Sequence, residues 1–142
     1  MKSLYEILEE KDRLRILAKE IDKDSEVTEE FKNQHLENIQ GFLKTTEIPN
    51  SWDILLNYIE INPFLNKVFA NFGISGERSS CTLLFIVESY IYDDICSIYI
   101  KDLTVYHKKL IFRSEKYLDN IEFNNFLKEY IEIINEQQKK EE

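Results

Sequence analysis

The apolar run Ser80–Thr104, SCTLLFIVESYIYDDICSIYIKDLT, constrains the fold more than any other part of the chain. At 3.6 residues per turn its apolar residues share one side of a helix. That broad face consists of Leu84, Phe85, Val87, Ile91, Tyr92, Ile95, Cys96, Ile98, Tyr99 and Leu103. The opposite side gathers Asp93, Asp94, Ser97 and Lys101. Glu88 interrupts the apolar face, so the pattern predicts a central helix with one out-of-place carboxylate.

The same region also has the composition of strands. Val, Ile, Thr, Tyr and Phe are dense in 81–112, and these residue types favour strands. The fragments TLLFIV, CSIYI and LTVYHKKLIF would form a small meander. Clean period-2 alternation and an Asn-Gly or Asp-Gly turn are missing, which favours the helix. We therefore expect an all-α fold, a compact bundle of about six helices packed around a central helix at 80–104. The alternative is an α+β fold with a small meander in 81–112.

Capping signals and apolar stripes predict the other helices. Ser3 and Glu6 have capping-box spacing at the start of a helix that runs to about Ile21. Further helices are expected to begin at Asp24 or Ser25, at Ser51, at Asn62-Pro63 with an end at Gly73, and at Asn120. The scarcity of Gly (3) and Pro (2) favours long helices with short connections. Residues 1–142 are predicted to form a single helical domain whose tail, 136–142, frays.

The net charge of −9 and the pI near 4.8 limit the classes of partner. An acidic surface repels phosphate backbones and anionic membranes, so we expect no direct nucleic-acid ligand and no membrane contact. The first residues lack the apolar stretch of a signal peptide. The apolar run contains Glu88, Asp93 and Asp94, which argue against a membrane span. These features predict a soluble, cytoplasmic protein whose partner is a basic protein.

Metal ions and cofactors have little support in the sequence. Asp22, Asp24 and Glu26 alternate as at the start of a calcium loop, but Val27 and Asn33 occupy the positions that need Gly and Glu. The two cysteines and two histidines are scattered without ligand spacing. In one helix Cys81 and Cys96 would lie about 22 Å apart, so both are expected to be reduced, buried thiols. We predict no metal, no cofactor and no catalytic residue.

The distribution of charge suggests where a partner binds. Between Glu20 and Glu60 ten acids face three lysines, a local balance of −7, whereas Lys101–Lys116 has a balance of +3. An acidic face steers a basic partner towards itself, and an exposed tryptophan can anchor the contact. The predicted partner-binding residues are Glu20, Asp22, Asp24, Glu26, Glu29, Glu30, Glu37 and Trp52.

The leading hypothesis is a non-enzymatic, acidic protein-interaction module. Its most concrete form is a small inhibitor of a basic enzyme or nucleic-acid-binding protein, such as an immunity protein, an antitoxin or a phage-encoded antagonist. The abundance of Ile, Lys, Asn and Glu is compatible with an AT-rich bacterial or phage genome. The alternative is a ligand-binding regulatory helical domain with a pocket near Glu88, where Tyr92, four residues away, would hydrogen-bond to the buried carboxylate. An enzyme using Glu88 is a third class, and a homodimer through an apolar helix face is compatible with all of them.

Overall fold

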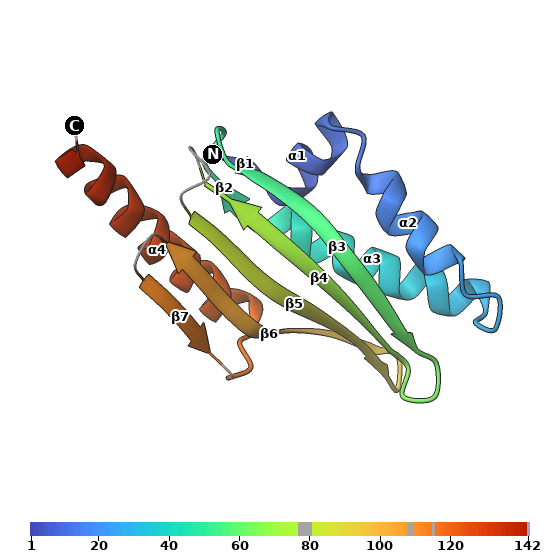
Figure 1. Ribbon diagram of the computed structural model, residues 1–142. Coiled ribbons are helices and arrows are strands. Elements are labelled where there is room, and N and C mark those ends of the chain that lie inside the picture. The colour runs from blue at the N-terminus through green and yellow to red at the C-terminus, as the bar shows by residue number, and fades with distance from the viewer. Residues whose placement is uncertain (77–80, 108–109, 115, 142) are drawn as a thin grey trace.

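The computed structural model describes residues 1–76, 81–107, 110–114 and 116–141, and it has an α+β fold (Figure 1). Three helices precede a run of five strands, β3 to β7, and a long helix follows them. The elements are β1 (Lys2–Ser3), α1 (Leu4–Glu10), α2 (Leu14–Asp22), α3 (Glu29–Thr45), β2 (Glu47–Ile48), β3 (Asp53–Asn62), β4 (Lys67–Ser75), β5 (Cys81–Tyr92), β6 (Ile95–His107), β7 (Leu110–Ser114) and α4 (Asn120–Glu141).

Strands β3 to β7 form one antiparallel meander in the order β3-β4-β5-β6-β7, and β1 pairs separately with β2. β5 and β6 are joined by a two-residue turn in which Asp93 and Asp94 have φ of 47° and 62°. Two consecutive positive φ angles give the turn whose twist matches that of the strands it joins, and Asp tolerates this conformation better than most residues. Bulges interrupt the register at Leu56/Tyr58 and at Leu84/Ile86.

The helices lie on one face of the sheet, which is the far side in Figure 1. α1 and α2 contact β3, α3 contacts β5 and β6, and α4 contacts β6. The core between these layers centres on Phe85, whose ring lies 4.9 Å from that of Phe123, 5.8 Å from Phe72 and 6.2 Å from Phe42. Alternate residues of β4 and β5 reach this core, so the buried set includes Val68, Ala70, Phe72, Ile74, Leu83, Phe85 and Val87.

The expected all-α bundle is wrong, and the expected central helix at 80–104 is the hairpin β5–β6. The α+β alternative fits, although the meander extends over 53–114 and is larger than the one considered. The error has a physical cause. Residues of β5 on the face away from the helices, such as Leu84, Ile86 and Tyr90, are also apolar and half-buried, so alternation is hidden within a continuous apolar run. Ser80 lies outside the described residues.

Two other expected helices are also strands. The segments predicted from Ser51 and from Asn62-Pro63 form β3 and β4, with Pro63 in the turn between them. Gly73 ends no helix; it faces the Leu84 side chain, which a Cβ at position 73 would approach to 3.2 Å. Across this pair of strands, a glycine therefore lets the larger side chain lie close to the backbone.

The N-terminal and C-terminal helices agree better with the sequence. Ser3 caps α1 by accepting a hydrogen bond of 3.0 Å from the Glu6 amide. The expected helix to Ile21 is divided between α1 and α2 near Asp12, whose φ is 57°. α3 begins later than expected, after Thr28, which caps it through Phe31. α4 begins at Asn120 as predicted and runs to Glu141, so the segment expected to fray is helical over 136–141, and Glu142 lies outside the described residues.

Replacing Phe85 with Ala should lower the free energy of unfolding by about 3–5 kcal/mol, because it leaves a cavity among three other rings. The matched control is Phe64→Ala. The Phe64 side chain is 94% exposed in the β3–β4 turn, so its loss should change stability by less than about 0.5 kcal/mol. Urea unfolding followed by circular dichroism measures both changes. Equal effects of the two substitutions would contradict this packing.

Candidate functional site: a groove beside the β6 edge

The predicted acidic residues gather at one end of the helical layer, with one exception. Glu20 and Asp22 are on α2, Asp24 and Glu26 lie in the connection to α3, and Glu29 and Glu30 begin α3. Lysines partly neutralise this end, through Lys23–Glu20 at 2.6 Å, Lys32–Asp22 at 3.0 Å and Lys32–Glu29 at 3.5 Å. One neighbouring hollow is lined in part by Asp24 and Glu26. Another is lined in part by Glu30, Asp93 and Asp94. Glu37 is the exception, since it lies further along α3 in a different hollow.

Trp52 has no surface role. Its side chain is 4% exposed and packs edge-on against the ring of Tyr130 on α4, with the ring centroids 6.2 Å apart. The expectation of an exposed anchor failed because the segment after Ser51 begins a strand whose side chains point alternately into and out of the core.

Glu88 is buried as expected, with 1% of its surface exposed, but its partners differ from those expected. Its carboxylate accepts a hydrogen bond from the Tyr90 hydroxyl and pairs with Lys101 Nζ at 2.7 Å. The hydrogen bond to Glu88 raises the pKa of Lys101, while burial and then Glu88 raise the pKa of Tyr90. In a strand, residues two apart share a face. Tyr90 therefore donates the hydrogen bond to Glu88 that was expected from Tyr92. Tyr92 is 77% exposed, and its expected burial is wrong.

A second buried polar cluster joins α3 to β5. His35 Nδ1 lies 2.8 Å from Ser89 Oγ, and His35 Nε2 lies 3.0 Å from Asn66 Oδ1. Asn38 Nδ2 donates to Ser89 Oγ at 2.9 Å. These contacts suit a neutral imidazole with its proton on Nε2, since the Ser89 hydroxyl can then donate to Nδ1. His35 and Ser89 are fully buried, so the arrangement offers no accessible nucleophile and ties the helix to the sheet.

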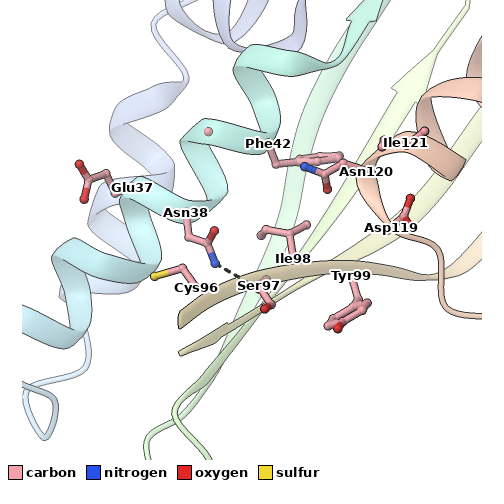
Figure 2. A pocket seen from close by; sticks show the side chains of 11 residues that line it. Glu37, Asn38, Phe42, Cys96, Ser97, Ile98, Tyr99, Asp119, Asn120 and Ile121 are labelled. Carbon is pink, nitrogen blue, oxygen red and sulfur yellow. Dashed lines mark hydrogen bonds between the residues drawn. The ribbon is translucent and has the colours of Figure 1, made fainter. Parts of the chain in front are cut away.

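The most distinctive hollow is a groove of about 470 Å³ between α3, the first half of β6 and the start of α4 (Figure 2). Figure 2 shows Ile98 on the side of Phe42 and Asn120, while Tyr99 points from the opposite side of the strand. The groove is lined by Glu37, Asn38, Gly41, Phe42, Cys96, Ser97, Ile98, Tyr99, Asp119, Asn120 and Ile121. Cys96 is an exposed free thiol, whereas the sequence predicted a buried one.

The groove exposes the edge of a strand because β7 is much shorter than β6. β7 pairs only with Leu103–His107, and a single bridge joins Ile100 to Leu118. The backbone groups of Ile100 exchange hydrogen bonds of 2.8 and 2.9 Å with Leu118 on this edge. Alternate residues point to the same edge, so the amides and carbonyls of Cys96 and Ile98 face the groove as well. In the described part of the chain no strand pairs with this edge over 95–99.

Polar groups from both flanking helices line the groove. Asn38 Nδ2 donates to the Ser97 carbonyl at 3.2 Å from the side of α3. Asp119 caps α4 by accepting from the Glu122 amide at 2.8 Å. Asn120 Oδ1 is buried and has no hydrogen-bond partner among the described residues. An unpaired buried oxygen costs about 1–3 kcal/mol, which a ligand that supplies an N–H or O–H donor would recover.

The groove is a concave site lined by polar, apolar and backbone groups. Its lining offers carboxylates, amides and open backbone groups, and it does not include Glu88. Within the described residues, no three His, Cys, Asp or Glu side chains are grouped so that they could hold a metal ion. None of the helices in the described ranges is long and apolar enough to cross a membrane. No protein family, no curated protein and no solved structure was found to match the chain.

Sequence reasoning missed every groove residue except Glu37. The edge of β6 exists because the last strand is short, and the sequence carries a signal for that. The apolar stretch Leu110–Phe112 lies between Lys108-Lys109 and Arg113, which limits the length of a final strand. The register in which β7 pairs with β6 leaves residues 95–99 without a neighbouring strand. The apolar pattern of one sequence does not specify this register.

Replacing Lys101 with Met should cost about 3–5 kcal/mol of unfolding free energy, because the Glu88 carboxylate stays buried without its cation. Adding Glu88→Gln should restore most of that stability. Lys2→Met is the control, since Lys2 forms a more exposed pair with Glu10 and should cost less than about 1 kcal/mol. Urea titrations of the four proteins provide the comparison. A double variant no more stable than the single one would contradict this role for Glu88.

Stability should also depend on His35 between about pH 7 and 5. Burial lowers the pKa of His35 below its ordinary 6.5, against a smaller opposing effect of Asn66. As the pH falls below 6.5 the unfolded chain takes up a proton that the folded chain refuses, so stability decreases by up to about 1.4 kcal/mol per pH unit. In His35→Gln this slope should disappear. Thermal unfolding at half-unit pH intervals measures it, and equal slopes in both proteins would exclude His35 as the source.

Proposed function

We propose that the chain is a non-enzymatic, acidic protein-interaction module that binds an extended, basic segment of a partner protein in the groove beside β6. The observation that carries this proposal is the open edge of β6 over 95–99, which faces a concave site instead of being covered. An uncovered strand edge is a template for another strand, and many proteins bind extended peptides by adding them to such an edge.

The groove has the dimensions and groups for strand addition. Five residues of β6 extend for about 16 Å, which accommodates a segment of similar length. The amides and carbonyls of Cys96 and Ile98 would pair with the backbone of the segment. Ile98 and Ile121 offer apolar contacts to alternate side chains, and the unpaired Asn120 Oδ1 accepts one donor. Backbone pairing supplies affinity in this mode, and the flanking side chains supply selectivity.

Charge favours a basic segment. Glu37 and Asp119 are exposed on opposite sides of the groove, and none of the described residues that line it is a Lys or Arg. The net charge of −9 and the carboxylates at the start of α3 extend the negative field beyond the groove. Such a field raises the association rate of a cationic partner and disfavours anionic ones.

A small inhibitor of a basic enzyme or nucleic-acid-binding protein is the most concrete form of this function. Immunity proteins, antitoxins and phage-encoded antagonists are classes that would use such a module. An acidic surface can occupy the cationic region with which a basic enzyme approaches phosphate groups. The exposed thiol of Cys96 fits a reducing compartment, so the proposal includes a cytoplasmic location.

The test is selection of random dodecapeptides displayed on phage against the full chain, followed by calorimetric titration of the enriched peptides. We expect enrichment of Lys and Arg. Glu37→Gln with Asp119→Asn should weaken binding about 5–20-fold, since each pair at an exposed rim contributes less than about 1 kcal/mol. Asn remains a good N-cap, so α4 is preserved. Cys96→Pro removes an edge amide and should weaken binding at least about 10-fold.

Glu26→Gln with Glu30→Gln is the matched control, because it changes the net charge equally at the other acidic site. If the peptides bind this control as tightly as they bind the native chain, the result supports binding in the groove. Peptides that lose affinity only in the control would place binding at the start of α3. Unchanged affinity in Cys96→Pro would exclude strand addition at β6.

A further inference from the structure

The face of the sheet away from the helices has no covering layer in the described part of the chain. The described helices lie against the other face of the sheet, as Figure 1 shows. The strand register identifies the residues on the uncovered face. Those on the four long strands include Leu55 and Tyr58 of β3, Phe69 and Asn71 of β4, Leu84, Ile86 and Glu88 of β5, and Tyr99 and Tyr106 of β6.

This face is apolar and partly open to water. Leu55, Tyr58 and Tyr106 are each 46% exposed, and Tyr99 is 42% exposed. Between them Phe69, Leu84 and Ile86 are half-buried. Antiparallel sheets that face water normally alternate apolar residues towards the core with polar residues towards solvent. A contiguous apolar patch on the surface instead marks an interaction site.

The charges on this face favour a second copy of the chain as the molecule that covers it. At its register positions the carboxylates of Glu60 and Glu88 are matched by Lys67 and Lys101, while Asp53 at the edge of the sheet pairs with Lys11 at 2.8 Å and Arg13 at 2.7 Å. The formal charge of the four central positions is therefore zero, whereas the chain has −9. A strongly basic partner would be drawn to the helical side. A second copy of the chain meets no net repulsion if the two neutral faces approach each other and the acidic sides point away.

The charged side chains at the centre of the face are already largely buried in the single chain. The Glu88 side chain is 2% exposed and that of Lys101 is 26% exposed in the single chain. Lys101 Nζ also lies 4.9 Å above the Phe69 ring. Most of the desolvation cost of this ion pair is therefore met on folding, so covering it with another apolar face adds little.

The size of the face is close to what a dimer requires. Four strands at about 4.8 Å spacing and nine residues at about 3.4 Å give a projected area near 600 Å² per copy. Two copies would bury about 1,200 Å², at the lower end of the range for specific interfaces. Sheets can pack face to face in an aligned or an orthogonal manner, and either arrangement satisfies a twofold axis.

We infer that the uncovered face of the β3–β6 sheet is an interface between two copies of this chain, which associate face to face as a homodimer. This inference is independent of the groove, since the strand edge and the sheet face are different surfaces of β6. It also differs from the homodimer considered from the sequence, which used an apolar face of a helix.

Analytical ultracentrifugation of the full chain between about 1 and 100 μM tests this inference, because interfaces of this size give dissociation constants in the micromolar range or below. We expect the mass to approach twice 17.0 kDa at the upper concentrations. Tyr58→Arg with Tyr106→Arg places like charges on the face and should raise the dissociation constant at least about 10-fold. The matched control is Ile16→Arg on α2, with 47% exposure, which should leave the constant unchanged.

A chain that stays monomeric at about 100 μM would overturn the inference. So would a dimer that persists in the double variant or is lost in Ile16→Arg. A second measurement on the native chain covers the case in which the double variant fails to fold. In methyl-labelled protein, the NMR signals of Leu55, Leu84 and Ile86 should shift with concentration while that of Ile16 stays constant. The reverse pattern would place the contact on the helical side.

Discussion

The packing of α3 against β5 is the contact on which the remaining structure depends. Phe85 contacts Phe42 of α3, Phe72 of β4 and Phe123 of α4. One ring therefore joins α3 and α4 to the middle of the sheet. The buried contacts of His35 and Asn38 with Ser89 fix α3 along the same strand. Hydrophobic packing has little directional preference, whereas these hydrogen bonds require one alignment of the helix with the strand. The position of α3 in turn sets one wall of the groove.

The described helices all lie on one side of the sheet, so the residues on its other side are in contact with water. Here Glu88, Lys101 and Tyr90 form a hydrogen-bonded cluster within an otherwise apolar face. The cluster removes an isolated charge from solvent and leaves the rings around it half-exposed. Its members lie on neighbouring strands, so it also opposes a shift of register between β5 and β6, which would separate Glu88 from Lys101. We see this cluster as an element of structural specificity whose surface remains apolar enough for association.

The sequence was informative where local chemistry decides the structure. The Ser3 cap and the start of α4 depend on a few adjacent residues, and they were predicted. The burial of Glu88 followed from its apolar neighbours, and the exposed carboxylates of α2 and α3 followed from composition. The strands were missed because β5 is apolar on both faces. The partner of Glu88 was missed because Lys101 meets it only through the pairing of two strands. The groove depends on the length of β7, which tertiary pairing determines.

β6 contributes to both proposed surfaces through different directions of its backbone. Hydrogen-bonding groups lie in the plane of a sheet and point to its edge, whereas side chains stand perpendicular to that plane. The amides of Cys96 and Ile98 therefore face the groove, while the Tyr99 ring stands on the uncovered face, as Figure 2 shows. A segment added at the edge would extend the sheet sideways without covering its face. One short strand, β7, thus leaves half of β6 open to the proposed partner, and the position of the described helices on one side leaves the other face open to the proposed second copy.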